Sequence, residues 1–139
     1  MLIAFLSLIA GLSAVYLHLY KLGVIGNLTC STGGCNRAIY SPWGWFLGVD
    51  VALIGMIGYS LLFAASIASL QPRWQDAAWP VRTLLVLATL GFCFTIHLKY
   101  GEFIVLRTFC PWCAISAVCI TVITILAVVE YRAFRQRSA

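Results

Sequence analysis

Four long apolar stretches, almost free of charged residues, determine what this chain can fold into. A helix that spans a membrane needs roughly 20 apolar residues, so a chain of 139 residues has room for about four spans and the loops between them. The stretches that we expect to span are residues 2–21, 46–70, 83–98 and 110–130. The sequence therefore predicts an all-α membrane protein, a four-helix bundle in one domain over residues 1–139.

The composition supports a membrane protein and excludes several other classes. Of the residues, 63% are hydrophobic and 9% are charged, whereas an ordinary soluble domain has about 45–50% apolar and about 25% charged residues. The nine Lys and Arg are dispersed along the chain, which argues against a nucleic-acid partner. The first stretch lacks the basic region that opens a secretory signal peptide, so we expect it to be retained as a helix.

The orientation of the bundle follows from the basic residues near the span ends, because the side richer in Lys and Arg stays in the cytoplasm. The balance is five against four and favours the side that holds the two chain ends. The loops 23–45 and 99–109 then face outward. The five residues on the cytoplasmic side are Arg73, Arg82, Arg132, Arg135 and Arg137, and the four on the outer side are Lys21, Arg37, Lys99 and Arg107.

Two pairs of cysteines lie in the outer segments. Cys30 and Cys35 enclose four residues in the first outer loop, and Cys110 and Cys113 form a C-x-x-C motif where the fourth span begins. Pro111 suits the first turn of a helix, where the N-terminal N–H groups favour a cysteine thiolate. Residues three apart share a helix face, so the C-x-x-C pair can form a disulfide. This pattern favours thiol–disulfide exchange.

Two alternative roles for these four cysteines stay open. They form two structural disulfides, which oxidising compartments favour, or a tetrahedral zinc site made of the C-x4-C and C-x-x-C pairs. A membrane bundle has little need for such cross-links, and zinc sites are more typical of polar soluble modules. We therefore rank redox exchange first, structural disulfides second and a metal last. The alternative function is a structural or assembly subunit of the membrane.

The two cysteines within spans, Cys93 and Cys119, are expected to act as small apolar residues.

The order of the motifs resembles the vitamin K epoxide reductase family in its bacterial form. The resemblance runs from the first outer loop to the end of the fourth helix. A DsbB-type oxidase, the nearest rival, has its C-x-x-C in the first outer loop, so the motif order argues against it. The elements that carry the resemblance are the pair Cys30 and Cys35, then Ser41 within Ser41-Pro42-Trp43-Gly44, then a glycine-rich second helix from Gly48 to Tyr59, and finally the pair Cys110 and Cys113.

The resemblance implies an electron relay in a bacterial inner (cell) membrane, with the active-site loops facing the periplasm and both termini in the cytoplasm. Electrons would pass from a DsbA-like thioredoxin-fold protein through Cys30 and Cys35 to Cys110 and Cys113. A membrane quinone, ubiquinone or menaquinone, would accept them without a metal. A short half-helix in the first outer loop would cap this site. Some relatives carry a fused thioredoxin-like domain, but this chain ends at Ala139, so the partner is expected in trans.

A quinone site needs apolar walls and a few hydrogen-bond donors, since the ring is flat and carries two carbonyl acceptors. We expect Ser41 to be a donor, and Trp43, Ile54, Tyr59 and Leu106 to form walls. Ser41 before a proline is equally typical of an ordinary helix N-cap, and Trp43 is equally typical of an interface anchor.

The remaining polar residues receive simpler interpretations. We expect Asp50 to be solvated or held by the dipole of the second helix, with proton transfer to the reduced quinone as the alternative. His18 is expected to be a packed or interfacial residue, and Lys99 and Glu102 to be solvated in a loop. In the eukaryotic members of the family a tyrosine follows the C-x-x-C, whereas Ala114-Ile115-Ser116-Ala117 follows here, which argues against epoxide reduction.

Overall fold

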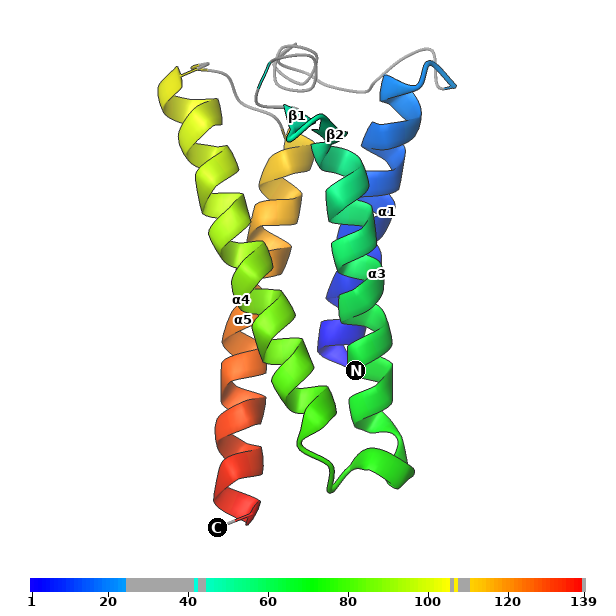
Figure 1. Cartoon of the computed structure of the whole chain (residues 1–139), viewed down its shortest axis with the longest axis vertical. Helices are drawn as coiled ribbons and strands as arrows, with labels where there is room; N and C mark the ends of the chain where they lie inside the picture. The colour runs from blue at the N-terminus through cyan, green and yellow to red at the C-terminus, as the bar shows by residue number, and fades with distance from the viewer. Residues whose placement is uncertain (25–41, 43–44, 106, 108–110, 139) are drawn as a thin grey trace.

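Four long helices make up most of the computed structural model, which describes residues 1–24, 42, 45–105, 107 and 111–138. Each helix is long and apolar enough to cross a membrane. The predicted all-α four-helix membrane bundle is thus confirmed (Figure 1). The expected capping half-helix falls on residues outside the described ranges. The four helices are α1 (Leu2–Lys21), α3 (Val51–Leu70), α4 (Trp79–Tyr100) and α5 (Pro111–Ser138).

The helices run alternately up and down, so both chain ends lie at one end of the bundle (Figure 1). α1 and α4 each pack against both α3 and α5. Small residues bring α1 and α3 close together: a Cβ added at Gly55 would lie 3.7 Å from the Ala14 Cβ. Leu84 and Ile123 are fully buried between the helices. Many large apolar side chains, such as Val86 and Val118, are instead exposed, as expected for a surface that lipid covers.

A small hairpin precedes α3, where the sequence predicted that the second helix already begins at residue 46. Its strands, β1 (Trp45–Phe46) and β2 (Val49–Asp50), are antiparallel, with Trp45 opposite Asp50. Leu47 and Gly48 form the turn and both have positive φ, 52° and 81°. A two-residue hairpin turn needs this backbone, which no helix provides. The second helix therefore begins at Val51, and the hairpin lies at the end of the bundle opposite the termini (Figure 1).

The third and fourth helices are longer than the sequence predicted. α4 begins at Trp79 rather than at residue 83, because Pro80 is tolerated in a first turn. A π-helical segment, η3 (Gly101–Val105), continues α4. α5 extends to Ser138 instead of ending at residue 130. Arg135 and Arg137 stand in its last turn, where positive charge stabilises a helix C-terminus. A short 3-10 helix, η2 (Pro72–Trp74), lies between α3 and α4.

Candidate functional site

A cavity of about 450 Å³ lies among the four helices. Pockets that hold small molecules usually measure about 300–1,000 Å³ and have mostly apolar walls. Each helix contributes to the walls here, for example through Ala14 of α1, Gly58 of α3, Phe94 of α4 and Cys113 of α5. The cavity is therefore large enough for a ring-sized ligand and is reached by one of the predicted redox cysteines.

Cys113 stands in the first turn of α5, half-buried, and lines the cavity. The helix begins at Pro111, as the sequence predicted. The first-turn N–H groups lack partners within the helix, so Cys113 stands at the end of α5 that carries partial positive charge. The other three predicted redox cysteines, Cys30, Cys35 and Cys110, lie outside the described residues.

Two of the five residues predicted to form a quinone pocket lie in the cavity wall. They are Ile54 and Tyr59 of α3. Ser41, Trp43 and Leu106 lie outside the described part of the chain. Of two glycines of α3, Gly55 packs closely against α1, since a Cβ there would lie 3.7 Å from the Ala14 Cβ, whereas a Cβ at Gly58 would meet no atom within 4 Å. Gly58 faces the open cavity instead.

Tyr59 connects α3 to α5 through Ser116, which lies one helical turn after Cys113. Its side chain is 7% exposed, and its hydroxyl donates to the backbone carbonyl of Ser116 at 3.2 Å. The two hydroxyls also share a hydrogen bond of 2.7 Å. Ser116 lines the cavity as well, since residues three apart on a helix share a face. Cys113 and a pair of hydroxyl groups therefore face the same space.

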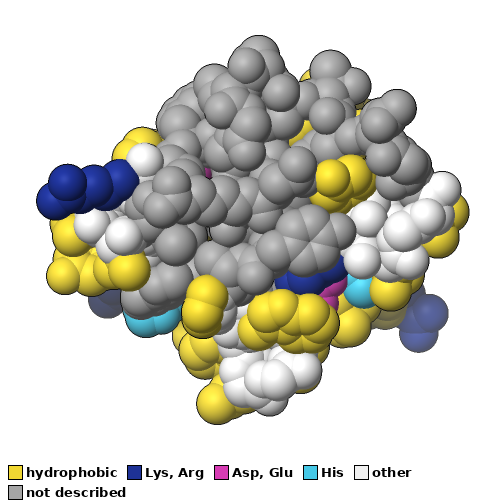
Figure 2. Space-filling model, turned by 90° about the horizontal axis from the view of Figure 1, so that it is seen from above, with side chains coloured by type: hydrophobic (Ala, Val, Ile, Leu, Met, Phe, Trp, Pro, Cys, Tyr) yellow, Lys and Arg dark blue, Asp and Glu magenta, His cyan; other side chains and the backbone are white. Residues whose placement is uncertain are grey.

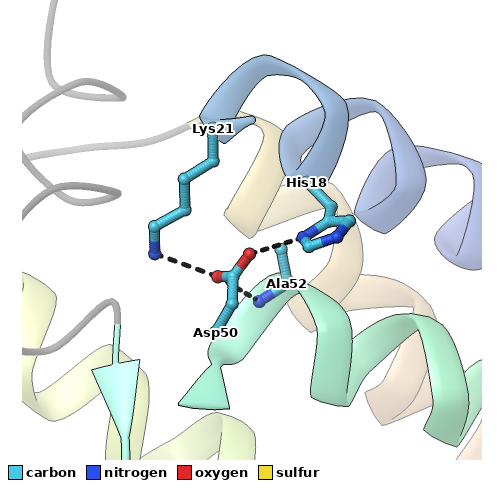
Figure 3. A network of polar contacts seen from close by, with 4 residues as sticks. All are labelled: His18, Lys21, Asp50 and Ala52. Atoms are coloured by element: carbon cyan, nitrogen blue, oxygen red, sulfur yellow. Dashed lines mark hydrogen bonds and ion pairs between the residues drawn. The ribbon is translucent and has the colours of Figure 1, made fainter. Parts of the chain in front are cut away.

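A buried carboxylate, that of Asp50 in strand β2, lines the cavity, and Figure 3 shows it between His18 and Lys21. Its Oδ2 lies 2.6 Å from Nδ1 of His18, and its Oδ1 accepts from Lys21 Nζ at 2.9 Å. The same Oδ1 accepts from the backbone N–H of Ala52 at 3.1 Å, which makes Asp50 the N-cap of α3. Lys21 also lies 4.0 Å from the ring centroid of Trp45. One carboxylate thus joins the end of α1, the hairpin and the start of α3.

The partners of Asp50 keep it ionised. Burial raises the pKa of its carboxyl group, but hydrogen bonds from His18, Lys21 and the Ala52 amide outweigh that effect. The pKa of Asp50 therefore lies below its ordinary value. An ionised carboxylate only accepts hydrogen bonds, so His18 donates from Nδ1.

A second ion pair lines the same cavity from the other side of the bundle. Lys99 Nζ of α4 lies 2.6 Å from Oε2 of Glu102 in η3, and both residues belong to the cavity wall. Glu102 is 6% exposed, so the expected loop solvation of this pair is wrong. Because η3 continues α4, it turns the carboxylate inward where the sequence suggested a loop. Seen from the hairpin end, acidic, basic and histidine side chains meet among hydrophobic ones (Figure 2).

The expected solvation of Asp50 is wrong, since it is 7% exposed, whereas the expectation that the start of the second helix holds it agrees with its position as the N-cap of α3. Its pairing with His18 and Lys21 was not expected. The signal was present: His18 and Lys21 are three residues apart at the end of one helix, and Asp50 precedes the next helix along the chain. Antiparallel neighbouring helices bring such ends together. The pairing becomes visible only when the end of the first helix and the start of the second are considered jointly.

The two cysteines within the spans differ in their surroundings. Cys119 is buried in the core, as expected for a small apolar residue. Cys93 is exposed on the outer surface of α4. Neither lines the cavity that Cys113 reaches.

The comparison with known families agrees with this arrangement of helices and thiols. The model of the vitamin K epoxide reductase family matches residues 1–128, which include all four helices up to the last turns of α5. Because the match covers most of the chain and includes Cys113 with its cavity, this multi-pass membrane protein belongs to the vitamin K epoxide reductase family and is a membrane thiol oxidoreductase.

Proposed function

We propose that the protein generates disulfides by reoxidising a DsbA-like thioredoxin-fold protein and delivering the electrons to a membrane quinone. The electrons pass first to the pair Cys30 and Cys35, then to Cys110 and Cys113. The observation that carries this proposal is the position of Cys113, a first-turn cysteine on the wall of a large apolar cavity. A cysteine that only formed a structural disulfide between two loops would not have to line such a cavity.

The residues of the cavity fit a quinone. When bound, a quinone accepts two electrons and two protons. Ile54, Leu90 and Phe94 offer apolar walls for the ring, and Tyr59 and Ser116 bring hydroxyl groups to the same space. Lys21 and Lys99 also line the cavity, each in an ion pair with a carboxylate, that of Asp50 or Glu102, so these four residues together add no net charge.

The driving force suits this direction of electron flow. A DsbA-like protein has a potential near about −120 mV, and for a two-electron couple each 30 mV corresponds to about 1.4 kcal/mol. Any quinone more oxidising than the partner therefore drives the reaction. We further propose that the hairpin end of the bundle faces the periplasm of a bacterial inner membrane, because Arg132, Arg135 and Arg137 lie at the opposite end.

The test is quinone reduction by the detergent-purified protein supplied with a reduced thioredoxin-fold dithiol, followed by the absorbance of the quinone. Replacing Cys113→Ser removes the thiol on the cavity wall and is expected to abolish turnover. Cys93→Ser is the matched control, because that cysteine is exposed on the outer face of α4, and it is expected to retain the parent rate. If Cys113→Ser reduces quinone as fast as Cys93→Ser, the electrons do not pass through Cys113 and the proposal is wrong. If the parent reduces no quinone, the alternative of a structural subunit holds.

A further inference from the structure

The charge on Asp50 exceeds what a helix cap requires. Asn and Ser cap helices about as well as Asp and carry no charge, whereas a buried ion pair is costly to desolvate. Asp50 nevertheless keeps a carboxylate at 7% exposure and engages both of its oxygens. The carboxylate must therefore serve more than the first turn of α3.

The network leads from a more exposed group to the cavity. The His18 side chain is 19% exposed, whereas those of Asp50 and Lys21 are 8% and 6% exposed. Asp50 and Lys21 belong to the cavity wall, together with Cys113. A proton that arrives at His18 thus has a 2.6 Å contact to Oδ2 of Asp50, and Asp50 presents its carboxylate to the cavity. Figure 3 shows this order, with Asp50 between His18 and Lys21.

Reduction of a quinone needs such a route. Oxidation of the Cys110 and Cys113 dithiol forms one S–S bond and releases two electrons and two protons, while the quinone takes up two of each. Cys113 stands at the start of α5, where the protons that the dithiol releases can pass to water. An equal number must return to the cavity, whose walls are mostly apolar.

We propose that His18 and Asp50 carry one of these protons, from outside water through Nδ1 of His18 and Oδ2 of Asp50, to the bound acceptor. This inference rests on the proposed quinone site. Lys21 fixes the carboxylate through Oδ1 and is a positioning residue. Among the described residues, the other titratable groups that line the cavity are Lys99 and Glu102 of the opposite side, Tyr59 of α3 and Cys113 of α5. A bound quinone would take up protons on reduction, and Asp50 would supply one of them from Oδ2.

The main test replaces Asp50→Asn, which retains the cap and the side-chain shape but removes the charge and the proton-carrying oxygen. The protein is first reduced, then mixed with a short-chain ubiquinone analogue, and the single-turnover rate is followed across pH. We expect the Asn variant to be at least tenfold slower at neutral pH and to lose the pH dependence of the parent. Asp76→Asn is the matched control, because Asp76 is an exposed carboxylate in the loop between α3 and α4; it is expected to retain the parent profile.

A second readout needs no quinone. The chain has two histidines, so ¹⁵N-histidine spectra of the protein show one signal set for His18 and an internal reference from His97. Nδ1 of His18 is expected to carry a proton in the parent, and Asp50→Asn is expected to shift that signal and leave His97 in place. A His18→Gln variant should slow the quinone step as Asp50→Asn does, and it decides the case if the Asn variant does not fold.

The outcomes separate this inference from the proposed function. Exchange between the reduced partner and the protein disulfides, measured by thiol alkylation without quinone, is expected to stay within twofold in every variant. If the parent reduces quinone and Asp50→Asn and His18→Gln match its rate and pH profile, the relay is wrong and Asp50 is only a cap. If the parent exchanges disulfides but never reduces quinone, the proposed function is wrong, and the relay is wrong with it.

Discussion

Gly58 offers the sharpest way to test what the cavity binds. It lines the cavity, and a Cβ added there meets no atom within 4 Å, so Gly58→Leu places its side chain in open space. Deleting a buried leucine side chain can leave a void of about 150 Å³, so adding one fills a volume on that order. That volume is a substantial part of the 450 Å³ cavity. Helix propensity improves by about 1 kcal/mol when leucine replaces glycine, so the fold is expected to tolerate the change.

We expect Gly58→Leu to weaken the binding of quinone. Overfilling a packed space costs about 1–3 kcal/mol, which corresponds to roughly a 5- to 150-fold rise in the KM for quinone. The assay is steady-state quinone reduction at saturating dithiol, with thiol exchange measured separately by alkylation and expected to be unchanged. Ser60→Leu is the matched control, because it adds leucine to the same helix at an exposed position. An unchanged KM in Gly58→Leu, or an equal rise in Ser60→Leu, refutes the assignment of the cavity.

Three further predictions concern stability, measured by reversible unfolding in detergent. Tyr59→Phe removes the hydrogen bond between the hydroxyls of Tyr59 and Ser116 and should lower the free energy of unfolding by about 0.6 kcal/mol and at most about 1.7 kcal/mol. Adding Ser116→Ala to this variant should lower it little further. Fully additive losses in the double variant contradict a direct hydrogen bond. Leu47→Asn should stabilise by about 1 kcal/mol, because Leu47 has a φ of 52° that asparagine adopts more readily; a loss of stability shows that the exposed leucine packs against something. The pKa of Asp50 is lower in the folded protein than its ordinary 3.8, so its ionised form contributes stability above about pH 4 that is lost as the pH falls through the folded value. The stability difference between the parent and Asp50→Asn should therefore shrink in acid, and a difference independent of pH contradicts the ion pairs.

The fold was predictable because apolar length is a strong signal. Four stretches that are long, apolar and almost free of charged residues favour four membrane-spanning helices, because every backbone group of a spanning helix forms its hydrogen bonds within that helix. The start of α5 was equally readable, since Pro111 fits only a first turn. The hairpin at Trp45–Asp50 was not predicted because its residues are as apolar as those of a span. Its positive φ angles depend on a Leu-Gly turn that lacks the usual Asn or Asp.

The polar half of the site was harder to predict than the apolar half. Ile54 and Tyr59 were expected as walls, and they line the cavity. The pairing of His18 and Lys21 with Asp50 arises because the end of α1 lies beside the start of α3 in the bundle. The periodicity of a single helix does not indicate which ends lie side by side. The inward turn of Glu102 depends on the π-helical segment η3, whose geometry has no clear sequence signal. The position of a residue was thus predictable where one helix face decides it, and was not predictable where two elements must meet.

The most direct test of the electron relay is a single turnover of the fully reduced protein with excess quinone in the absence of any thiol partner. The account predicts that two quinones are reduced per chain, one for each dithiol, as the pairs Cys110 and Cys113 and Cys30 and Cys35 become resistant to alkylation, and that Cys113→Ser shows neither change. Quinone reduction without loss of the Cys113 thiol, or oxidation of that thiol without quinone reduction, contradicts the account.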